Sequence, residues 1–170
     1  MNQIEIILGP MFAGKTTELI RRLRRYKIAN KKCIILKCQR DNRYETDKIC
    51  THDKGTMDAI PCEKLCSVDC DNYDVIGIDE GQFFPDLLQF CKKVTNKIIV
   101  IASLDGDFKQ QPFGNTLQLI PKATSVVKLN AVCNKCYGDA PFTTRIVDDN
   151  NVELIGGTEY YIAICKDCMQ

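Results

Sequence analysis

Gly9-Pro10-Met11-Phe12-Ala13-Gly14-Lys15-Thr16 is the stretch that decides the fold of this chain. It fits the pattern G-x-x-x-x-G-K-[S/T] at every defined position, with an apolar run before it and helical spacing after it. A strand before and a helix after are the context that a phosphate-binding loop requires. Glycines let backbone N–H groups turn toward phosphate oxygens, and the start of the helix adds its positive dipole end. Lys15 would reach the β- and γ-phosphates, and the Thr16 hydroxyl would ligate Mg²⁺. The alternative is a chance glycine-rich turn.

Apolar runs alternate with helical patterns up to about residue 130. The short apolar runs rich in β-branched residues lie at 3–8, 33–37, 75–79, 97–102 and 126–129. Apolar spacing favours helices at 16–30 and 85–94, whereas 40–56 is polar and aperiodic, which predicts a long loop or lid. Strands that alternate with helices form parallel βαβ units. The sequence therefore predicts an α/β fold with a doubly wound, mainly parallel sheet over 1–130, followed by a small subdomain over 131–170.

A pair of carboxylates follows the apolar run at 75–79. Asp79 ends the run and Glu80 comes next, which is the Walker B position of a P-loop protein. Asp79 would hold Mg²⁺, directly or through water, and Glu80 would accept a proton from the group that attacks the γ-phosphate. Water as that nucleophile would make the protein an NTPase, and a hydroxyl would make it a kinase. Phe83 and Phe84 follow closely, and they could stack on a planar base or pack in the core.

Size and charge narrow the possible functions. The chain has 170 residues, of which 45% are hydrophobic, and a formal net charge of +1. This charge speaks against a dedicated nucleic-acid binder, whereas a small anionic substrate needs only a local positive site. We expect the basic run at 21–25 to be a solvated helix face, with a nucleic-acid patch as the alternative. No run approaches the roughly 20 apolar residues of a membrane helix, and no signal-type region begins the sequence, so we expect a cytoplasmic protein.

The eleven cysteines fall into two groups. Their number is odd, so they cannot all pair within the chain. The scattered ones, which we expect to be reduced thiols acting as small core residues, are Cys33, Cys38, Cys50, Cys62, Cys66, Cys70 and Cys91. The other four form two C-x-x-C knuckles, Cys133 with Cys136 and Cys165 with Cys168. Two knuckles predict one structural, tetrahedral Zn²⁺ site, since four thiolates leave no coordination position open. Disulfides or a redox C-x-x-C are the alternatives.

Further motifs make the chain resemble a known family. In order they are Asn42-Arg43-Tyr44, Cys50-Thr51-His52-Asp53, IDEGQFF at 78–84, LDGDF at 104–108, PFG at 112–114, VVKLNAVC at 126–133 and IGG at 155–157. Together they closely resemble the type II thymidine kinases of vertebrate cytosol, many bacteria and poxviruses. The resemblance runs from about Ile4 to Cys168, and the segment DEGQFF and the paired knuckles are its most specific parts.

This resemblance implies an activity and a set of site residues. The enzyme would transfer a phosphoryl group from ATP to the 5′-hydroxyl of thymidine, with Glu80 as general base and with Asp79 and Thr16 on the Mg²⁺ side. The residues implied to bind ATP are Gly9, Pro10, Met11, Phe12, Ala13, Gly14, Lys15, Thr16 and Asp79. The residues implied to bind thymidine are Met11, Phe83, Leu104, Phe108, Phe113, Thr143, Val152, Glu153, Leu154, Ile155, Gly156 and Tyr161. Phe108 would stack on thymine, and the loop between the knuckles would close over the base as a lasso that binds largely through backbone groups.

The same resemblance implies an assembly and a regulator. The protein would be a homotetramer, inhibited by thymidine triphosphate. Asp41 and Arg43, in the polar segment, would touch phosphate or substrate. The sequence stops two residues after Cys168, so the resemblance leads us to expect a viral or bacterial-type member.

Two departures from the family pattern are visible. Ile162 stands where a histidine is often found, and Asp107 with Gln110 and Gln111 replaces a more basic run beside the nucleoside pocket. Two functions stay open beside a nucleoside kinase. One is a P-loop ATPase whose zinc ribbon grips nucleic acid, and the other is a zinc-stapled module that only senses nucleotide.

Overall fold

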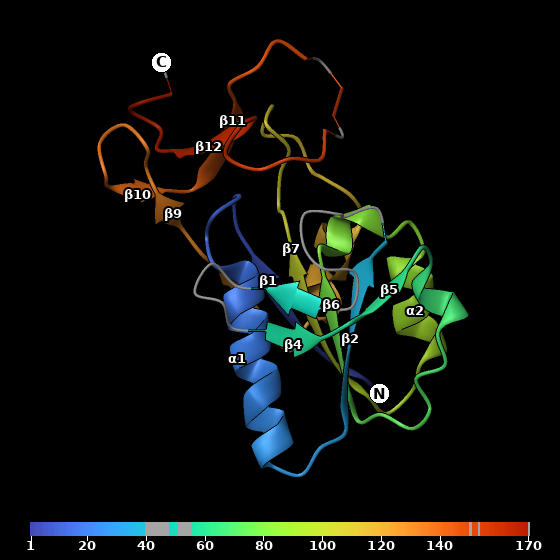
Figure 1. The fold of residues 1–170 in the computed structure, drawn as a ribbon. Helices are drawn as coiled ribbons and strands as arrows, with labels where there is room; N and C mark the ends of the chain where they lie inside the picture. The colour runs from blue at the N-terminus through green and yellow to red at the C-terminus, as the bar shows by residue number, and fades with distance from the viewer. Residues whose placement is uncertain (40–47, 51–55, 150, 153, 170) are drawn as a thin grey trace.

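A six-stranded sheet forms the centre of the molecule (Figure 1). The computed structural model describes residues 1–39, 48–50, 56–149, 151–152 and 154–169. The strands of the sheet are β1 (Gln3–Leu8), β2 (Cys33–Cys38), β5 (Ile60–Cys62), β6 (Val75–Asp79), β7 (Ile98–Ser103) and β8 (Ser125–Lys128). Their order is β5-β2-β6-β7-β1-β8, and every neighbouring pair is parallel. The predicted α/β class with a mainly parallel sheet is confirmed.

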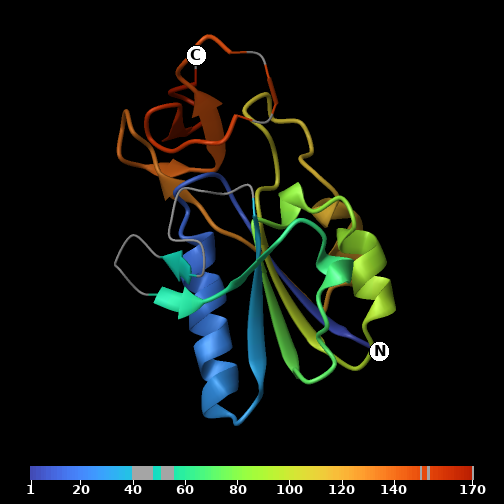
Figure 2. The ribbon, with the colours of Figure 1, turned by 45° about the vertical axis from the view of Figure 1, so that its right-hand side comes forward.

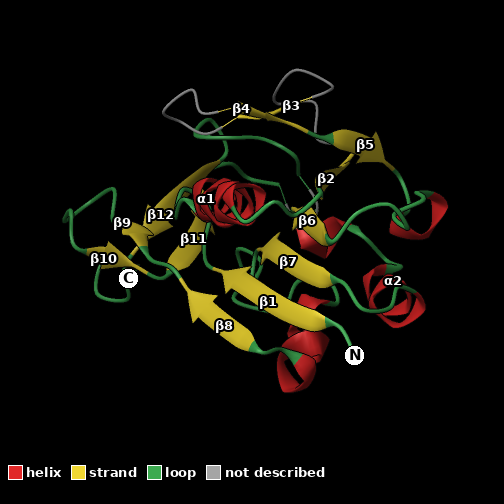
Figure 3. Ribbon diagram, turned by 90° about the horizontal axis from the view of Figure 1, so that it is seen from below, coloured by secondary structure: helices red, strands yellow, loops and turns green. Residues whose placement is uncertain are grey.

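Helices cover both faces of this sheet, as the view along the strands shows (Figure 3). The long helix α1 (Lys15–Ile28) covers one face. The helices on the opposite face are α2 (Leu87–Lys93) and the short 3₁₀ helices η1 (Leu65–Ser67), η2 (Gly81–Phe83) and η3 (Thr116–Lys122). Right-handed crossovers between parallel strands place connecting helices on a sheet face in this way.

Alternation along the strands divides the core into two layers. In β1, Ile6 and Leu8 face the α2 side and share a buried cluster with Phe90. Ile7 between them faces the other side and packs in a second cluster with Leu23 of α1. Successive side chains of a strand point to opposite faces, so one apolar run supplies both layers.

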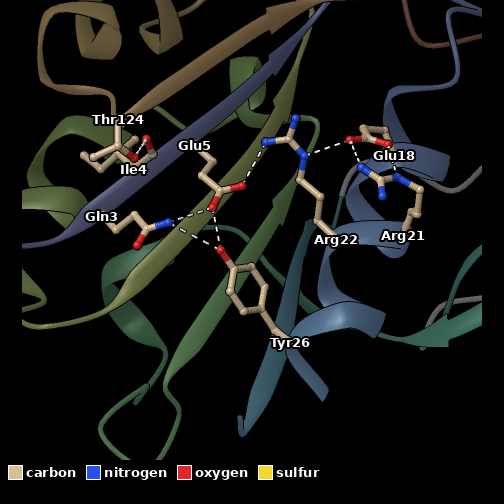
Figure 4. Close-up of polar contacts among 8 residues, drawn as sticks. All are labelled: Gln3, Ile4, Glu5, Glu18, Arg21, Arg22, Tyr26 and Thr124. Atoms are coloured by element: carbon tan, nitrogen blue, oxygen red, sulfur yellow. Dashed lines mark hydrogen bonds and ion pairs between the residues drawn. The ribbon is translucent and has the colours of Figure 1, made fainter. Parts of the chain in front are cut away.

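Polar contacts also fasten α1 to the sheet (Figure 4). Glu5 lies on the α1 face of β1 and is only 9% exposed. Its Oε2 accepts a 2.8 Å hydrogen bond from Arg22 Nη1, and its Oε1 accepts one of 2.5 Å from the Tyr26 hydroxyl. Arg22 also pairs with Glu18 at 2.8 Å. A carboxylate at this depth needs such partners, since an unpaired buried charge is costly. The arginine run therefore does more than form a solvated face.

Several boundaries differ from the sequence-based expectations. The helix predicted over 16–30 ends at Ile28, because Asn30 adopts a left-handed conformation (φ 58°) that stops it. The loop predicted over 40–56 is wrong in its described part, where β3 (Lys48–Cys50) pairs antiparallel with β4 (Thr56–Asp58). Residues 40–47 and 51–55, with Asp41 and Arg43, lie outside the described residues.

The edge strand β5 and the helix η3 also escape the sequence patterns. β5 has three residues and contains Pro61, which a central strand would not tolerate but an edge strand does. η3 contains Pro121. β5 is too short for a hydrophobic period to reveal it, and the proline inside η3 speaks against a regular helix there.

Two hairpins stand over the carboxyl ends of the central strands (Figures 1 and 2). They pair β9 (Ala131–Val132) with β10 (Asp139–Ala140), and β11 (Phe142–Arg145) with β12 (Tyr161–Ile164). Their small core is formed by Ala131, Cys133, Ala140, Ala163 and Ile164. Phe12 and Ala13, from the loop after β1, pack against that core. None of the described helices is both long and apolar enough to cross a membrane.

Candidate active site

The loop between β1 and α1 has the backbone shape that its glycines allow. Gly9 has φ 150° and Gly14 has φ 78°, both in regions that residues with a side chain rarely adopt. A Cβ at Gly9 would lie 2.6 Å from the carbonyl oxygen of Leu129. The loop therefore turns tightly beside the chain that follows β8, and α1 begins directly after it at Lys15.

Two side chains at the start of α1 face groups of the loop and the sheet. Lys15 is 8% exposed, and its Nζ donates a 2.7 Å hydrogen bond to the carbonyl oxygen of Pro10. The Thr16 hydroxyl donates to Asp79 at the end of β6, with distances of 3.0 Å to Oδ1 and 3.3 Å to Oδ2. A hydroxyl and a carboxylate side by side are hard oxygen donors of the kind that Mg²⁺ prefers.

Glu80 lines a cavity and has an unusual backbone conformation. It has φ 54° and ψ 49°, a left-handed conformation that costs a non-glycine residue about 1–2 kcal/mol. The turn takes the chain from β6 into η2 and leaves the carboxylate in the cavity wall. Gln82 Nε2 donates a 2.6 Å hydrogen bond to Glu80 Oε2. A strained backbone at Glu80, directly after the carboxylate of Asp79, makes this pair a candidate catalytic site.

One cavity gathers almost all the residues that the sequence assigned to a nucleoside. Its lining includes Met11, Phe83, Leu104, Phe108, Phe113, Thr143, Val152, Leu154, Ile155, Gly156 and Tyr161, together with Glu80. Glu153 lies outside the described residues. The sequence missed Gln82, Gly106 and Asp107 as lining residues. The cavity thus has apolar and aromatic walls with a few convergent polar groups, as small-molecule sites do.

The two adjacent phenylalanines take different roles. Phe84 is completely buried in the core on the α2 side. Phe83 lines the cavity and meets Phe113 edge to face, with ring centroids 5.7 Å apart and an angle of 89°. Edge-to-face pairs are favourable for aromatic rings. Of the two expectations for this dipeptide, core packing describes Phe84, and an aromatic wall describes Phe83.

Contacts join the phosphate loop to the hairpins above it. The backbone N–H of Met11 donates a 2.9 Å hydrogen bond to the hydroxyl of the buried Thr143 on β11. On β12, the hydroxyl of Tyr161 donates a 2.7 Å bond to the carbonyl oxygen of Leu154. The cavity is therefore closed by segments that are far apart in the sequence.

The segment that departs from the family pattern forms a compact turn beside the cavity. Oδ1 of Asp107 accepts hydrogen bonds from the backbone N–H groups of Lys109 (2.8 Å) and Gln111 (2.9 Å). The side-chain amide of Gln110 reaches the sulfur of Met169, next to the last knuckle. The Asp107 side chain thus stabilises the turn that follows it by accepting hydrogen bonds from backbone N–H groups, as aspartate does in turns.

The four knuckle cysteines converge. The sulfur atoms of Cys133, Cys136, Cys165 and Cys168 all lie within 4.8 Å of one another. Four thiolates around one Zn²⁺ stand about 3.8 Å apart, given Zn–S bonds of about 2.3 Å in a tetrahedron. The Sγ atoms of Cys136 and Cys165 are 3.6 Å apart, which fits that geometry. The cluster could therefore hold a structural zinc ion.

The surroundings favour a thiolate at Cys133, whereas the hydrogen bond with the neighbouring Cys165 thiol raises the pKa of Cys168, in the same cluster, to about 12. Backbone N–H groups, chiefly that of Cys136, lower the pKa of Cys133 to about 6. Burial instead raises the pKa of Cys62 and Cys91 to about 12. Of the scattered cysteines, the buried ones are Cys38, Cys62, Cys70 and Cys91, and the partly buried ones are Cys33 and Cys66. None of these six forms a disulfide with another described residue, as expected; the side chain of Cys50 is not described.

Fold and site together define an α/β protein with a glycine-lysine-threonine loop before its first helix and a four-thiol cluster above its sheet. The sequence profile of the family described as thymidine kinase matches residues 2–169. The thymidine kinase of Vaccinia virus (strain Western Reserve) is 50% identical over 169 residues, which cover 97% of this chain and 95% of that protein.

Two further relatives agree with this match. The thymidine kinase of Yaba monkey tumor virus (strain VR587) is 52% identical over 97% of this chain and 93% of its own length. Thymidine kinase 1 of Dictyostelium discoideum is 50% identical over 98% of this chain and 77% of its own length. The chain belongs to the thymidine kinase family, and it is an enzyme that phosphorylates thymidine.

Proposed function

We propose that this enzyme transfers the γ-phosphoryl group of ATP to the 5′-hydroxyl of thymidine, giving ADP and dTMP for deoxynucleotide salvage. The observation that carries the proposal is the position of Glu80. Its carboxylate lies in the wall of the aromatic cavity, and it follows directly after Asp79, which bonds to the first turn of the helix behind the phosphate loop.

The phosphates of ATP lie along residues 9–16 in this proposal. The backbone N–H groups of the loop and the start of α1 favour an anion there. Lys15 exchanges its bond to the Pro10 carbonyl for phosphate oxygens, because a charged acceptor binds an ammonium group more strongly than a neutral carbonyl does. Thr16 and Asp79 would hold Mg²⁺, which would supply positive charge to neutralise the phosphates.

Glu80 is the general base of the proposed reaction. It accepts the proton of the 5′-hydroxyl as the oxygen forms its bond to the γ-phosphorus and the bond to ADP breaks. Because Glu80 lies near the phosphate loop in this proposal, its carboxylate accepts the proton of the 5′-hydroxyl without a large movement. The apolar lining of the cavity excludes water as a competing nucleophile.

Thymidine occupies the aromatic cavity in this proposal. Phe83 and Phe113 supply apolar walls, and the segment 152–156 offers backbone groups to the edge of thymine. Phe108 meets the base with the part of its ring left uncovered by the Arg145 guanidinium, 3.9 Å from the ring centroid, and the Lys109 ammonium, 5.3 Å from it. A pocket built to hydrogen-bond one edge of a base rejects bases that leave those groups unpaired.

The remaining proposals concern organisation. Residues 1–130 form the nucleotide-binding domain and 131–170 form a zinc-anchored lasso subdomain that holds the nucleoside. Its structural Zn²⁺ would compensate for a core of only five buried residues, four of which are alanine or cysteine. We also propose a cytoplasmic homotetramer with thymidine triphosphate as feedback inhibitor.

Product analysis tests the proposed chemistry. The protein is mixed with ATP, Mg²⁺ and each nucleoside in turn, and we expect dTMP from thymidine. Glu80→Gln is expected to lower kcat by roughly 10²–10⁴ with zinc content unchanged. Glu63→Gln, at an exposed carboxylate, serves as the matched control. Full activity of Glu80→Gln, or ATP turnover that depends on DNA and not on nucleoside, would overturn the proposal.

A further inference from the structure

Arg145, at the end of β11, is a buried cation whose surroundings are mostly backbone. Its side chain is 2% exposed. Nη1 donates a 2.6 Å hydrogen bond to the carbonyl oxygen of Asp149 and another to that of Asn151. Nη2 donates to the carbonyl oxygen of Val152 at 3.3 Å. Three carbonyl groups of the loop after β11 thus converge on one guanidinium.

The same guanidinium reaches β12. Nη2 donates a 2.6 Å hydrogen bond to the hydroxyl of Tyr161, which in turn donates a 2.7 Å bond to the carbonyl of Leu154. The donor and acceptor in each of these two hydrogen bonds are unambiguous, since arginine only donates and a carbonyl only accepts. All four Nη hydrogens are therefore used, and three of them hold the loop directly.

A third contact places Arg145 behind the cavity wall. Its guanidinium carbon lies 3.9 Å from the centroid of the Phe108 ring, within the range of a strong cation–π contact. Phe108, Tyr161, Val152 and Leu154 line the cavity, whereas Arg145 itself and the loop residues Asp149 and Asn151 are not lining residues. The carboxylate of Asp149, 4.0 Å away, balances part of the charge.

We infer that Arg145 is the positioning residue that holds the nucleoside loop and its aromatic walls in the form that accepts thymidine. This inference rests on the proposed function for its substrate. A planar fork that serves three carbonyls and a hydroxyl at once cannot be replaced by the single ammonium of lysine. If the loop occupies this form for only a fraction of the time, the apparent affinity for nucleoside is reduced to that fraction of its full value.

The test compares Arg145→Lys with Arg24→Lys, a matched change at an exposed arginine of α1, in the full-length, zinc-loaded protein. We expect Arg145→Lys to raise the KM for thymidine roughly tenfold or more, while the KM for ATP stays within about twofold and zinc content is unchanged. Guanidinium at millimolar concentration should partly restore the thymidine KM of Arg145→Ala. Chymotrypsin should cut Arg145→Lys faster within 146–160, whereas Arg24→Lys should behave as wild type.

Two results would overturn the inference. One is unchanged cleavage of 146–160 in Arg145→Lys, which needs no substrate to observe. The other is an equal rise in the KM for ATP and for thymidine together with loss of zinc, which would mean a general structural role. A wild-type protein that leaves thymidine unphosphorylated would instead refute the proposed function, and the cleavage comparison would still decide the role of Arg145.

Discussion

The side-chain amide of Gln82 donates a 2.6 Å hydrogen bond to Oε2 of Glu80. The orientation of that amide is fixed, because its Oε1 accepts from the backbone N–H of Leu104 at 3.0 Å and a backbone N–H can only donate. The Ser103 hydroxyl donates to the same Oε1 at 3.1 Å. Gln82 is 5% exposed, so the proposed general base is held by a group that the end of β7 fixes in place.

Gln82→Leu should therefore lower kcat more than it changes substrate binding. We expect kcat to fall roughly tenfold or more, since a misplaced carboxylate loses its reach to the hydroxyl, while the KM for ATP stays within about twofold. The unfolding free energy should fall by about 1–3 kcal/mol, because the buried N–H of Leu104 loses its acceptor. Steady-state kinetics and urea unfolding measure the two effects.

Gln89→Leu is the matched control for this change, since Gln89 is exposed on α2. It should leave kcat and stability close to those of the wild type. Equal kcat values for Gln82→Leu and Gln89→Leu would show that Glu80 needs no support from the amide.

Local sequence patterns predicted most of the central fold. The strands at 3–8 and 75–79 match β1 and β6 to the residue, because a buried parallel strand is a continuous apolar run. The antiparallel pair of β3 and β4 was missed. Each strand has only three residues, so it is recognised by its pairing with the other strand and not by a sequence pattern of its own. β5 was missed for the same reason, and its proline spoke against a strand.

Motif residues of the candidate site were predictable one by one, but their mutual support was not. The sequence indicated Asp79 and Glu80 as neighbours of a phosphate loop, and the cavity does bring Glu80 to the aromatic residues. Gln82 stands inside the quoted segment IDEGQFF, so the signal existed, but its bonds to Leu104 and Ser103 depend on how β6 and β7 pair. Arg145 carried no signal, because its contacts join the nearby loop at 149–152 to Tyr161 and to Phe108, which lie elsewhere in the sequence.

Loss of the zinc ion should disturb the hairpins at 131–169, which hold the nucleoside in our proposal, more than it disturbs the central sheet. Cys136→Ser is expected to abolish binding of one zinc ion per chain and to lower thymidine turnover roughly tenfold or more. The reason is that four of the five buried core residues of the hairpins are alanine or cysteine, so this core needs the ion to hold its knuckles together. Metal analysis and a thymidine kinase assay measure both quantities.

Cys66→Ser provides the control for that experiment, since Cys66 is a partly buried thiol away from the cluster. It should keep zinc and most of the activity. A zinc-free Cys136→Ser protein with full thymidine turnover would contradict a structural role for the cluster.

Stability should fall at alkaline pH as Tyr26 ionises. Burial, helped by the hydrogen bond to Glu5, raises the pKa of Tyr26 from 10 to about 12. A raised pKa means that the folded state favours the neutral phenol, so this contribution is complete below pH 10 and is lost as pH rises toward 12. The stability advantage of the wild type over Tyr26→Phe should shrink across that interval in urea unfolding.

Ultraviolet titration of phenolate gives an independent measurement of the same group. The wild type should show one more late-titrating tyrosine than Tyr26→Phe does. Tyr137→Phe, at a tyrosine that is 81% exposed, is the matched control for the loss of one phenol. Loss of an early-titrating group in Tyr26→Phe would mean that Glu5 does not hold this phenol in its neutral form.

Gly77→Ala should loosen the packing of α1 on the sheet. An added Cβ would lie 2.7 Å from Cδ1 of Leu23 and 3.3 Å from Cγ1 of Ile35, closer than side chains in a packed core approach. We expect the unfolding free energy to fall by about 1–3 kcal/mol, because the helix or the side chains must shift. Gly138→Ala is the control, since its Cβ would meet only the sulfur of Cys136 at an ordinary 3.6 Å. Combining Gly77→Ala with Leu23→Ala should cost less than the sum of the single changes by about 1 kcal/mol, and simple additivity would show that the two positions do not collide.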